Sequence, residues 1–138
     1  MPPGLLCLPS MPDLALLFIA GGLLRFCPPA RAHALLARLG SLLPALRTAE
    51  EARRAARSLS GHGTCLTRSL AISARAPAAE VVIAVQPRGR GPLFAHAWIE
   101  IDGTPINPSD VAGTVIARLR SPRARPRAEA GSNGEHPR

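Results

Sequence analysis

The sequence is poor in aromatic residues and has no lysine. Aromatic side chains make up 3% of the 138 residues, tyrosine is absent, and all 17 basic residues are arginine, with a formal net charge of +8. The core must therefore be built from Leu, Ala, Val and Ile. Nucleic-acid-binding proteins interleave aromatic residues with a basic face. The arginine-rich stretches here contain none, so we expect no nucleic-acid partner.

Cysteine is also scarce. Cys7, Cys27 and Cys65 are an odd number and show no CxxC spacing, which argues against a disulfide framework and against a zinc site. A reducing, cytoplasmic location fits this usage best, and we expect no metal or other cofactor. Cys7 and Cys27 lie among apolar residues and are interpreted as small buried hydrophobic side chains.

No apolar run is long enough for a stable membrane span. The run over residues 14–24 falls well short of the roughly 20 residues that a spanning helix needs. It is expected to be either a core helix or a targeting segment. Asp13 beside it, and the absence of basic residues before it, argue against an export signal.

The length predicts one domain. We expect an apolar and Pro-rich N-terminal segment over residues 1–29, a single domain with a helical N-terminal part over 30–119, and a disordered tail rich in Pro, Arg and Gly over 120–138.

The hydrophobic patterns predict an α+β fold, in which N-terminal helices precede a helix that carries Cys65 and packs on a small antiparallel sheet. Leucines at three- and four-residue spacing predict the first helix, and Thr48 three residues before Glu51 predicts a capping box at the second. Helices are expected over residues 30–46, 48–59 and 64–76, with a last short one over 111–119.

Strands are expected over residues 81–85, 94–101 and 104–107. The first is continuously apolar, which predicts a strand covered on both faces. Asp102-Gly103 is a strong signal for a two-residue hairpin turn. Pro105 cannot donate a hydrogen bond to a neighbouring strand, so the return strand is expected at an edge of the sheet.

Cys65 stands where the third helix is expected to begin, after a loop that contains Gly61 and Gly63. A helix N-terminus offers partial positive charge and unpaired N–H groups, which favour a thiolate and can stabilise an oxyanion at an attacked carbonyl. The residue is therefore a candidate nucleophile. The alternative is a buried cysteine without reactivity.

His96 is the candidate base for that thiol. The period of a strand places it on one face with Phe94, Trp98 and Glu100. A single strand histidine is more often structural, but a helix-start cysteine upstream favours a catalytic base. Trp98 would share a cleft between strand and helix, and Glu100 is interpreted as solvated or paired with an arginine.

The residue that orients the imidazole depends on the register of the hairpin. A two-residue turn at Asp102-Gly103 would place Asn107 on the face of His96, within side-chain reach. A three-residue loop would shift the pairing by one and place Asp110 there instead. Asp102 lies roughly 20 Å along the strand from His96, too far to act as the orienting group.

Three motifs carry a resemblance to a known family. They are Cys65-Leu66-Thr67-Arg68-Ser69-Leu70-Ala71, His96-Ala97-Trp98-Ile99-Glu100 and Pro105-Ile106-Asn107. They resemble the transglutaminase-like cysteine peptidases of lasso-peptide biosynthesis, which remove the leader from a microcin-type precursor. The resemblance covers about residues 55–112 and implies a transglutaminase-like, papain-like core.

By this resemblance Cys65 is the nucleophile, His96 the general base, Asn107 or Asp110 the orienting residue and Trp98 a substrate contact. The implied partners are a precursor peptide, a leader-recognition protein and a lasso cyclase, and no cofactor is implied. Two other hypotheses stay open: an inactive transglutaminase-like module that binds precursor or partner enzymes, and an acyl transferase of another substrate class.

Overall fold

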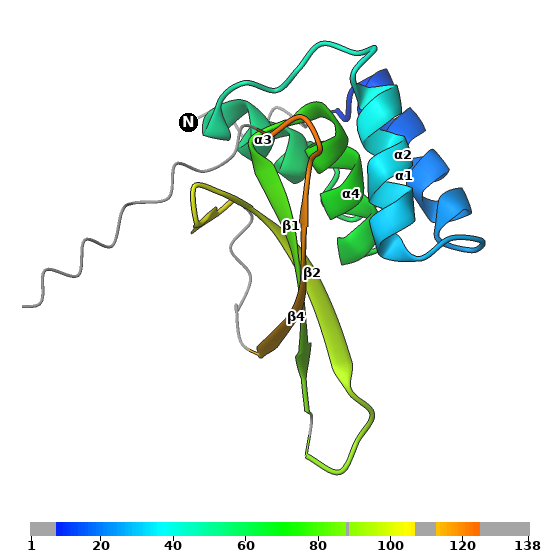
Figure 1. The fold of residues 1–138 in the computed structure, drawn as a ribbon, viewed down its shortest axis with the longest axis vertical. Coiled ribbons are helices and arrows are strands. Elements are labelled where there is room, and N and C mark those ends of the chain that lie inside the picture. The colour runs from blue at the N-terminus through cyan, green and yellow to red at the C-terminus, as the bar shows by residue number, and fades with distance from the viewer. Residues whose placement is uncertain (1–7, 88, 107–112, 125–138) are drawn as a thin grey trace, which may run out of the picture.

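The computed structural model describes residues 8–87, 89–106 and 113–124 as helices packed on one side of a sheet (Figure 1). The elements are α1 (Met11–Leu23), α2 (Pro29–Gly40), α3 (Ala49–Ser58), α4 (Cys65–Arg75), β1 (Ala79–Gln86), β2 (Phe94–Ile101), β3 (Thr104–Pro105) and β4 (Thr114–Arg120). All strand pairs are antiparallel, in the order β3-β2-β1-β4. The predicted α+β class is confirmed.

The helix α4 is central to the fold. It contacts β1 and β2 of the sheet and also packs against α1, α2 and α3. Leu70 and Ile72 join Val81 and Ile99 of the strands in one hydrophobic core. Two serines of α4 are buried with them, and their hydroxyls donate to backbone carbonyls one helical turn earlier, so these polar groups are satisfied inside the core.

The apolar segment near the N-terminus forms α1. Leu16, Leu17 and Ala20 lie in the same core as the strands. For residues 14–24 we expected either a core helix or a targeting segment, and the structure has a helix packed in the core. The folded unit thus includes residues before position 30. In the described part of the chain, we find no helix with the length and apolar character needed to cross a membrane.

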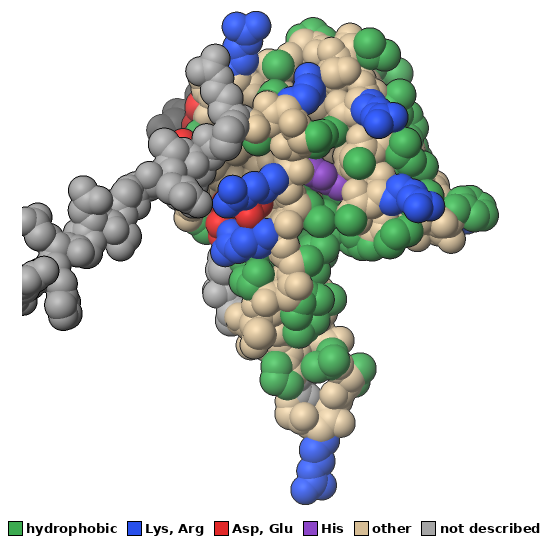
Figure 2. Space-filling model, viewed as in Figure 1, with side chains coloured by type: hydrophobic (Ala, Val, Ile, Leu, Met, Phe, Trp, Pro, Cys, Tyr) green, Lys and Arg blue, Asp and Glu red, His purple; other side chains and the backbone are tan. Residues whose placement is uncertain are grey.

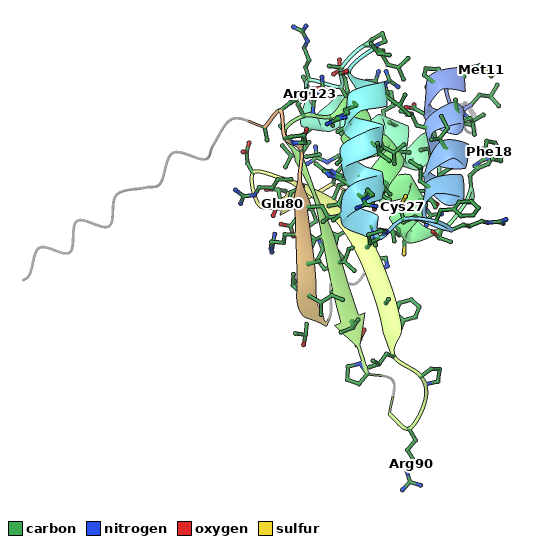
Figure 3. The ribbon with its side chains drawn as sticks, turned by 45° about the vertical axis from the view of Figure 1, so that its right-hand side comes forward. Met11, Phe18, Cys27, Glu80, Arg90 and Arg123 are labelled. Atoms are coloured by element: carbon green, nitrogen blue, oxygen red, sulfur yellow. The ribbon has the colours of Figure 1, made fainter. Side chains whose placement is uncertain are left out.

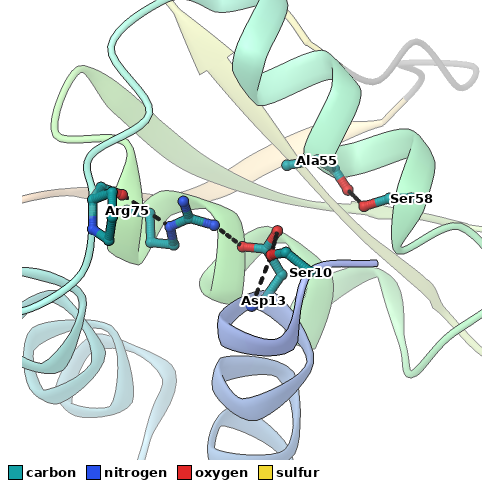
Figure 4. A network of polar contacts seen from close by, with 6 residues as sticks. Ser10, Asp13, Ala55, Ser58 and Arg75 are labelled. Carbon is teal, nitrogen blue, oxygen red and sulfur yellow. Dashed lines mark hydrogen bonds and ion pairs between the residues drawn. The ribbon is translucent and has the colours of Figure 1, made fainter. Parts of the chain in front are cut away.

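A buried ion pair joins the start of α1 to the end of α4 (Figure 4). Nη1 of Arg75 donates to Oδ1 of Asp13 over 2.6 Å, and both side chains are nearly inaccessible. The Ser10 hydroxyl donates to Oδ2 of the same carboxylate over 2.6 Å, and Nε of Arg75 donates to the Pro44 carbonyl over 3.0 Å. Both charges are therefore paired and hydrogen-bonded, as buried charges must be.

The capping box predicted for the second helix is confirmed in α3. Oγ1 of Thr48 accepts from the Glu51 amide, and the Glu51 carboxylate accepts from the Thr48 amide. The helix predicted over residues 30–46 is α2, which ends earlier, at Gly40. Pro44 opposes continuation of the helix, because it has no N–H to donate to the Gly40 carbonyl and its ring clashes with that carbonyl. Gly40 itself lies against α4: a Cβ there would lie 2.0 Å from the carbonyl oxygen of Ala74.

We expect Gly40→Ala to destabilise the protein by about 1–3 kcal/mol, because the added methyl would force α2 away from α4. Gly21→Ala is the matched control, since Gly21 is also helical and a Cβ there meets nothing within 4 Å. The control should gain up to about 1 kcal/mol from helix propensity. Urea unfolding of the two variants measures the difference, and equal midpoints would contradict the close approach.

The hairpin has the predicted two-residue turn. Ile101 pairs with Thr104 and Glu100 with Pro105, and both turn residues have positive φ, 51° at Asp102 and 76° at Gly103. This is the backbone of a type I′ turn, which asparagine, aspartate and glycine tolerate. The alternative three-residue loop is therefore wrong, and the edge position expected for the strand with Pro105 is confirmed.

The prediction of a last helix over residues 111–119 is wrong. The described part of that segment from Thr114 on is the strand β4, which pairs with the second edge of β1. Thr114, Val115 and Ile116 are β-branched, and β-branched residues favour strands. The helical interpretation did not take this preference into account. Cross-strand charge also favours the pairing, because Arg120 stands opposite Glu80 and their side chains approach to 3.5 Å.

Candidate functional site

Cys65 is the first residue of α4, as predicted, and is half-buried and free of any disulfide. Thr64 caps the helix in a reciprocal arrangement. Its hydroxyl accepts from the Thr67 amide over 3.2 Å, while the Thr67 hydroxyl accepts from the Thr64 amide over 2.8 Å. This is a capping box in which Thr67 takes the place of the usual glutamate. It fixes the turn of backbone that carries the thiol.

The same turn provides hydrogen-bond donors. The first N–H groups of a helix have no intrahelical acceptor, and at this helix Thr64 takes up the amide of Thr67. The amides of Cys65 and Leu66 remain without an acceptor within the helix. They are the groups that could bind an oxyanion next to the sulfur.

His96 lies on β2, where it pairs with Ala84 of β1. Its ring stacks between two other aromatic side chains. The centroid of Phe94 is 6.3 Å away at an interplanar angle of 14°, and that of Trp98 is 5.8 Å away at 26°. The imidazole is half-buried, so this stack orients it while leaving part of it accessible.

Ideal helix and strand dimensions place Cys65 and His96 at about the same distance along the sheet. The chain turns between the end of α4 and Ala79, and α4 runs back alongside β1 (Figure 1). At about 1.5 Å per residue, α4 extends about 15 Å back from Arg75 to Cys65. At about 3.3 Å per residue, the same length measured along β1 from Ala79 ends near Ala84. Ala84 is the strand partner of His96.

The two residues belong to different faces of the sheet. Ile99 and Val81 face the core that contains α4. Trp98 and Val82 form a separate cluster on the other face, and His96 shares that face because it alternates with Ile99 along the strand. β3 pairs with β2 only near its end, at Glu100 and Ile101.

Trp98 is almost fully buried, with 2% of its surface exposed. Its indole nitrogen donates to Oε1 of Glu100 over 2.9 Å, and Arg118 donates to Oε2 over 2.9 Å. Burial alone would raise the pKa of the Glu100 carboxyl, but these hydrogen bonds and the arginine charge lower it overall. Glu100 is thus paired with an arginine, one of the two expectations, while a substrate contact at Trp98 stays a prediction.

Asn107 and Asp110, the candidates for the orienting residue, lie outside the described residues, as do Cys7 and the tail beyond residue 124. The hairpin register bears on the choice between them. Ile101 pairs with Thr104, and the Ile106 amide donates to the carbonyl of Ile99. This is the register for which we predicted Asn107 on the face of His96.

Other polar features lie away from Cys65. A cavity of about 440 Å³ is lined by Glu80, Glu100, Asp102, Arg120 and other residues at the end of the sheet that carries the hairpin turn, and it includes neither Cys65 nor His96. Within the described residues, no group of three or more His, Cys, Asp or Glu side chains is arranged to hold a metal ion.

A second histidine, which the sequence analysis passed over, is buried in α2. His33 is 3% exposed, and burial lowers its pKa, which favours the neutral ring. Its position among apolar residues of the helix was the only signal in the sequence. Cys27, predicted to be buried, is half-buried and free.

Comparison with known proteins gives one match. A family model described as "Transglutaminase-like superfamily" matches residues 12–131, a range that runs from the second residue of α1 past the end of β4. A search of curated proteins and a search of solved structures found no match.

Proposed function

Because the chain belongs to the transglutaminase-like superfamily, we propose that it is a cysteine peptidase that removes the leader peptide from a lasso-peptide precursor of the microcin type. The observation that supports this most is the position of Cys65, at the capped N-terminus of the central helix. The cysteine and histidine motifs in this order add the resemblance to leader peptidases.

In the proposed reaction, His96 accepts the proton of the Cys65 thiol, and the sulfur attacks the carbonyl carbon of the scissile peptide bond. The amides of Cys65 and Leu66 stabilise the oxyanion. The C–N bond breaks as His96 gives the proton to the leaving amine, which leaves an acyl thioester. Water then attacks the thioester with His96 as base, so a carboxylate and the free thiol are released.

The orienting residue in this mechanism is Asn107, with Asp110 as the second candidate. Trp98 supports the imidazole from behind through the ring stack, and its contact with substrate is part of the proposal. The reaction consumes only water, so it needs no cofactor. We place it in the cytoplasm, with a leader-recognition protein that presents the precursor and a lasso cyclase that takes the product.

One observation favours a second candidate function. His96 lies on the face of the sheet opposite the core contact of α4, so the sheet stands between the imidazole and the helix that carries the thiol. If the thiol and the imidazole do not meet, the chain is an inactive transglutaminase-like module that binds the precursor or the partner enzymes.

Alkylation separates the two functions. At pH 7 we expect iodoacetamide to modify Cys65 at least about tenfold faster than Cys27, because an activated thiol has a larger thiolate fraction. Cys27 is the control within the same molecule, since both cysteines are free and half-buried. Peptide mass spectrometry over time gives the two rates. Equal rates, unchanged by His96→Ala, would support the inactive module.

A further inference from the structure

The outer face of α1 carries an apolar stripe that the core does not cover. It consists of the exposed helical residues Met11, Ala15, Phe18, Ile19 and Gly22, and the exposed Phe26 follows in the turn after the helix. Met11, Phe18 and Phe26 are 79%, 77% and 89% exposed. Figure 3 shows Met11 and Phe18 pointing away from the body of the protein. Large apolar side chains grouped in this way on a surface mark an interaction site.

The neighbouring helix α2 extends this surface and adds positive charge. Leu35, Leu39 and Leu42 are exposed beside Arg31 and Arg38. Figure 2 shows arginines set among the hydrophobic side chains over these helices. Long arginine side chains can lie along apolar surface and hold their charge at its rim.

The surface has no exposed negative charge to balance these arginines. Asp13 is the single acidic residue among residues 8–46, and it is buried in the ion pair with Arg75. Arg25, Arg31 and Arg38 are all exposed. The surface formed by α1 and α2 is therefore apolar and positively charged, which is complementary to a surface that is apolar and negatively charged.

We propose that this surface docks the protein on an anionic lipid membrane. The exposed stripe of α1 would lie in the plane of the membrane, with Phe18 and Phe26 among the upper acyl chains and the arginines at the headgroups. α1 itself has 13 residues, too few to cross a bilayer, for which about 20 are needed. The docking is independent of peptidase activity.

Charge also argues against a second copy of the chain as the binding partner of this surface. A two-fold symmetric contact brings the same patch of both copies together, so Arg31 and Arg38 would face each other with no exposed carboxylate of residues 8–46 to compensate. A membrane of anionic lipids supplies both the apolar layer and the negative charge.

The test is co-sedimentation of the full chain with lipid vesicles. We expect binding to vesicles of phosphatidylcholine and phosphatidylglycerol in equal parts, and binding at least about tenfold weaker to phosphatidylcholine alone, because the arginines contribute only with anionic lipid. Met11→Ser/Phe18→Ser should weaken binding to the mixed vesicles by about tenfold or more. The matched control is Leu93→Ser/Ile116→Ser, which removes two exposed apolar side chains elsewhere.

A second double variant, Arg31→Gln/Arg38→Gln, tests the contribution of charge. Each arginine is expected to contribute about fivefold to the affinity, so this variant should bind the mixed vesicles about 25-fold more weakly. Arg54→Gln/Arg90→Gln removes the same charge at two other exposed positions, one of them in the loop between β1 and β2 (Figure 3), and should change binding much less. Thermal melting checks that each variant is folded.

Three results would overturn the proposal. The first is equal affinity for the two kinds of vesicle. The second is equal loss in the Met11/Phe18 variant and its control. The third is a dimer, or a stable complex with one protein, that covers α1, is dissociated by Met11→Ser/Phe18→Ser, and leaves vesicle binding undetectable.

Discussion

Cys65→Ala is expected to abolish cleavage of the precursor, and His96→Ala to lower kcat by a factor of about 10⁴ or more, because nucleophile and base act as one unit. The assay takes as substrate a precursor peptide of the proposed microcin type, together with a leader-recognition protein. Mass spectrometry of the released leader measures the rate. Both residues lie at half-buried positions, so neither change opens a large cavity in the core.

The chain offers matched controls for both changes. Cys27→Ala removes the other half-buried free cysteine, and His62→Ala removes an exposed histidine three residues before Cys65. Both should keep nearly full activity. A double variant, Cys65→Ala/His96→Ala, should be no slower than Cys65→Ala alone. Full activity in Cys65→Ala or in His96→Ala would exclude the peptidase mechanism.

Short-range signals in the sequence identified most of the elements that carry the site. The capping box of Thr48 and Glu51 and the turn at Asp102-Gly103 each depend on residues within four positions of one another. Their geometry can therefore be read from the sequence and is present in the structure. Cys65 was placed at a helix start on similar grounds, from the glycines before it and the threonine that caps it.

Features that depend on distant parts of the chain were not predictable in this way. Arg75 lies 62 residues from its partner Asp13, and Gly40 lies against the backbone of Ala74 in another helix. The strand β4 forms on the open edge of β1, a partner that no local pattern reveals. For the site, strand periodicity put His96 and Trp98 on one face, but it could not say which face α4 would cover.

This difference matters for the mechanism. In the structure Ile99 faces the core that contains α4, whereas Trp98 and His96 lie on the other face of the sheet. The cleft that we expected between the helix and the strand face of Trp98 is therefore wrong, because α4 packs on the side of Ile99. The proposed mechanism therefore requires the thiol of α4 to reach an imidazole that lies on the opposite face of the sheet.

Asp13→Ala is expected to destabilise the protein by about 3–5 kcal/mol, because it leaves the guanidinium of Arg75 buried without its counter-charge. The melting temperature should fall by roughly 10–20 °C. The exposed pair of Glu50 and Arg57, which are 3.1 Å apart, provides the control. Glu50→Ala should cost at most about 1 kcal/mol, since water screens that pair.

The double variant Asp13→Leu/Arg75→Met tests the cause of this loss. If the cost arises from an unpaired buried charge, replacing both partners by apolar side chains should recover a large part of the stability lost in Asp13→Ala. Recovery should be incomplete, because Arg75 also donates to the Pro44 carbonyl and Asp13 accepts from Ser10. A double variant less stable than Asp13→Ala would mean that the link between α1 and α4 depends on these hydrogen bonds more than on charge.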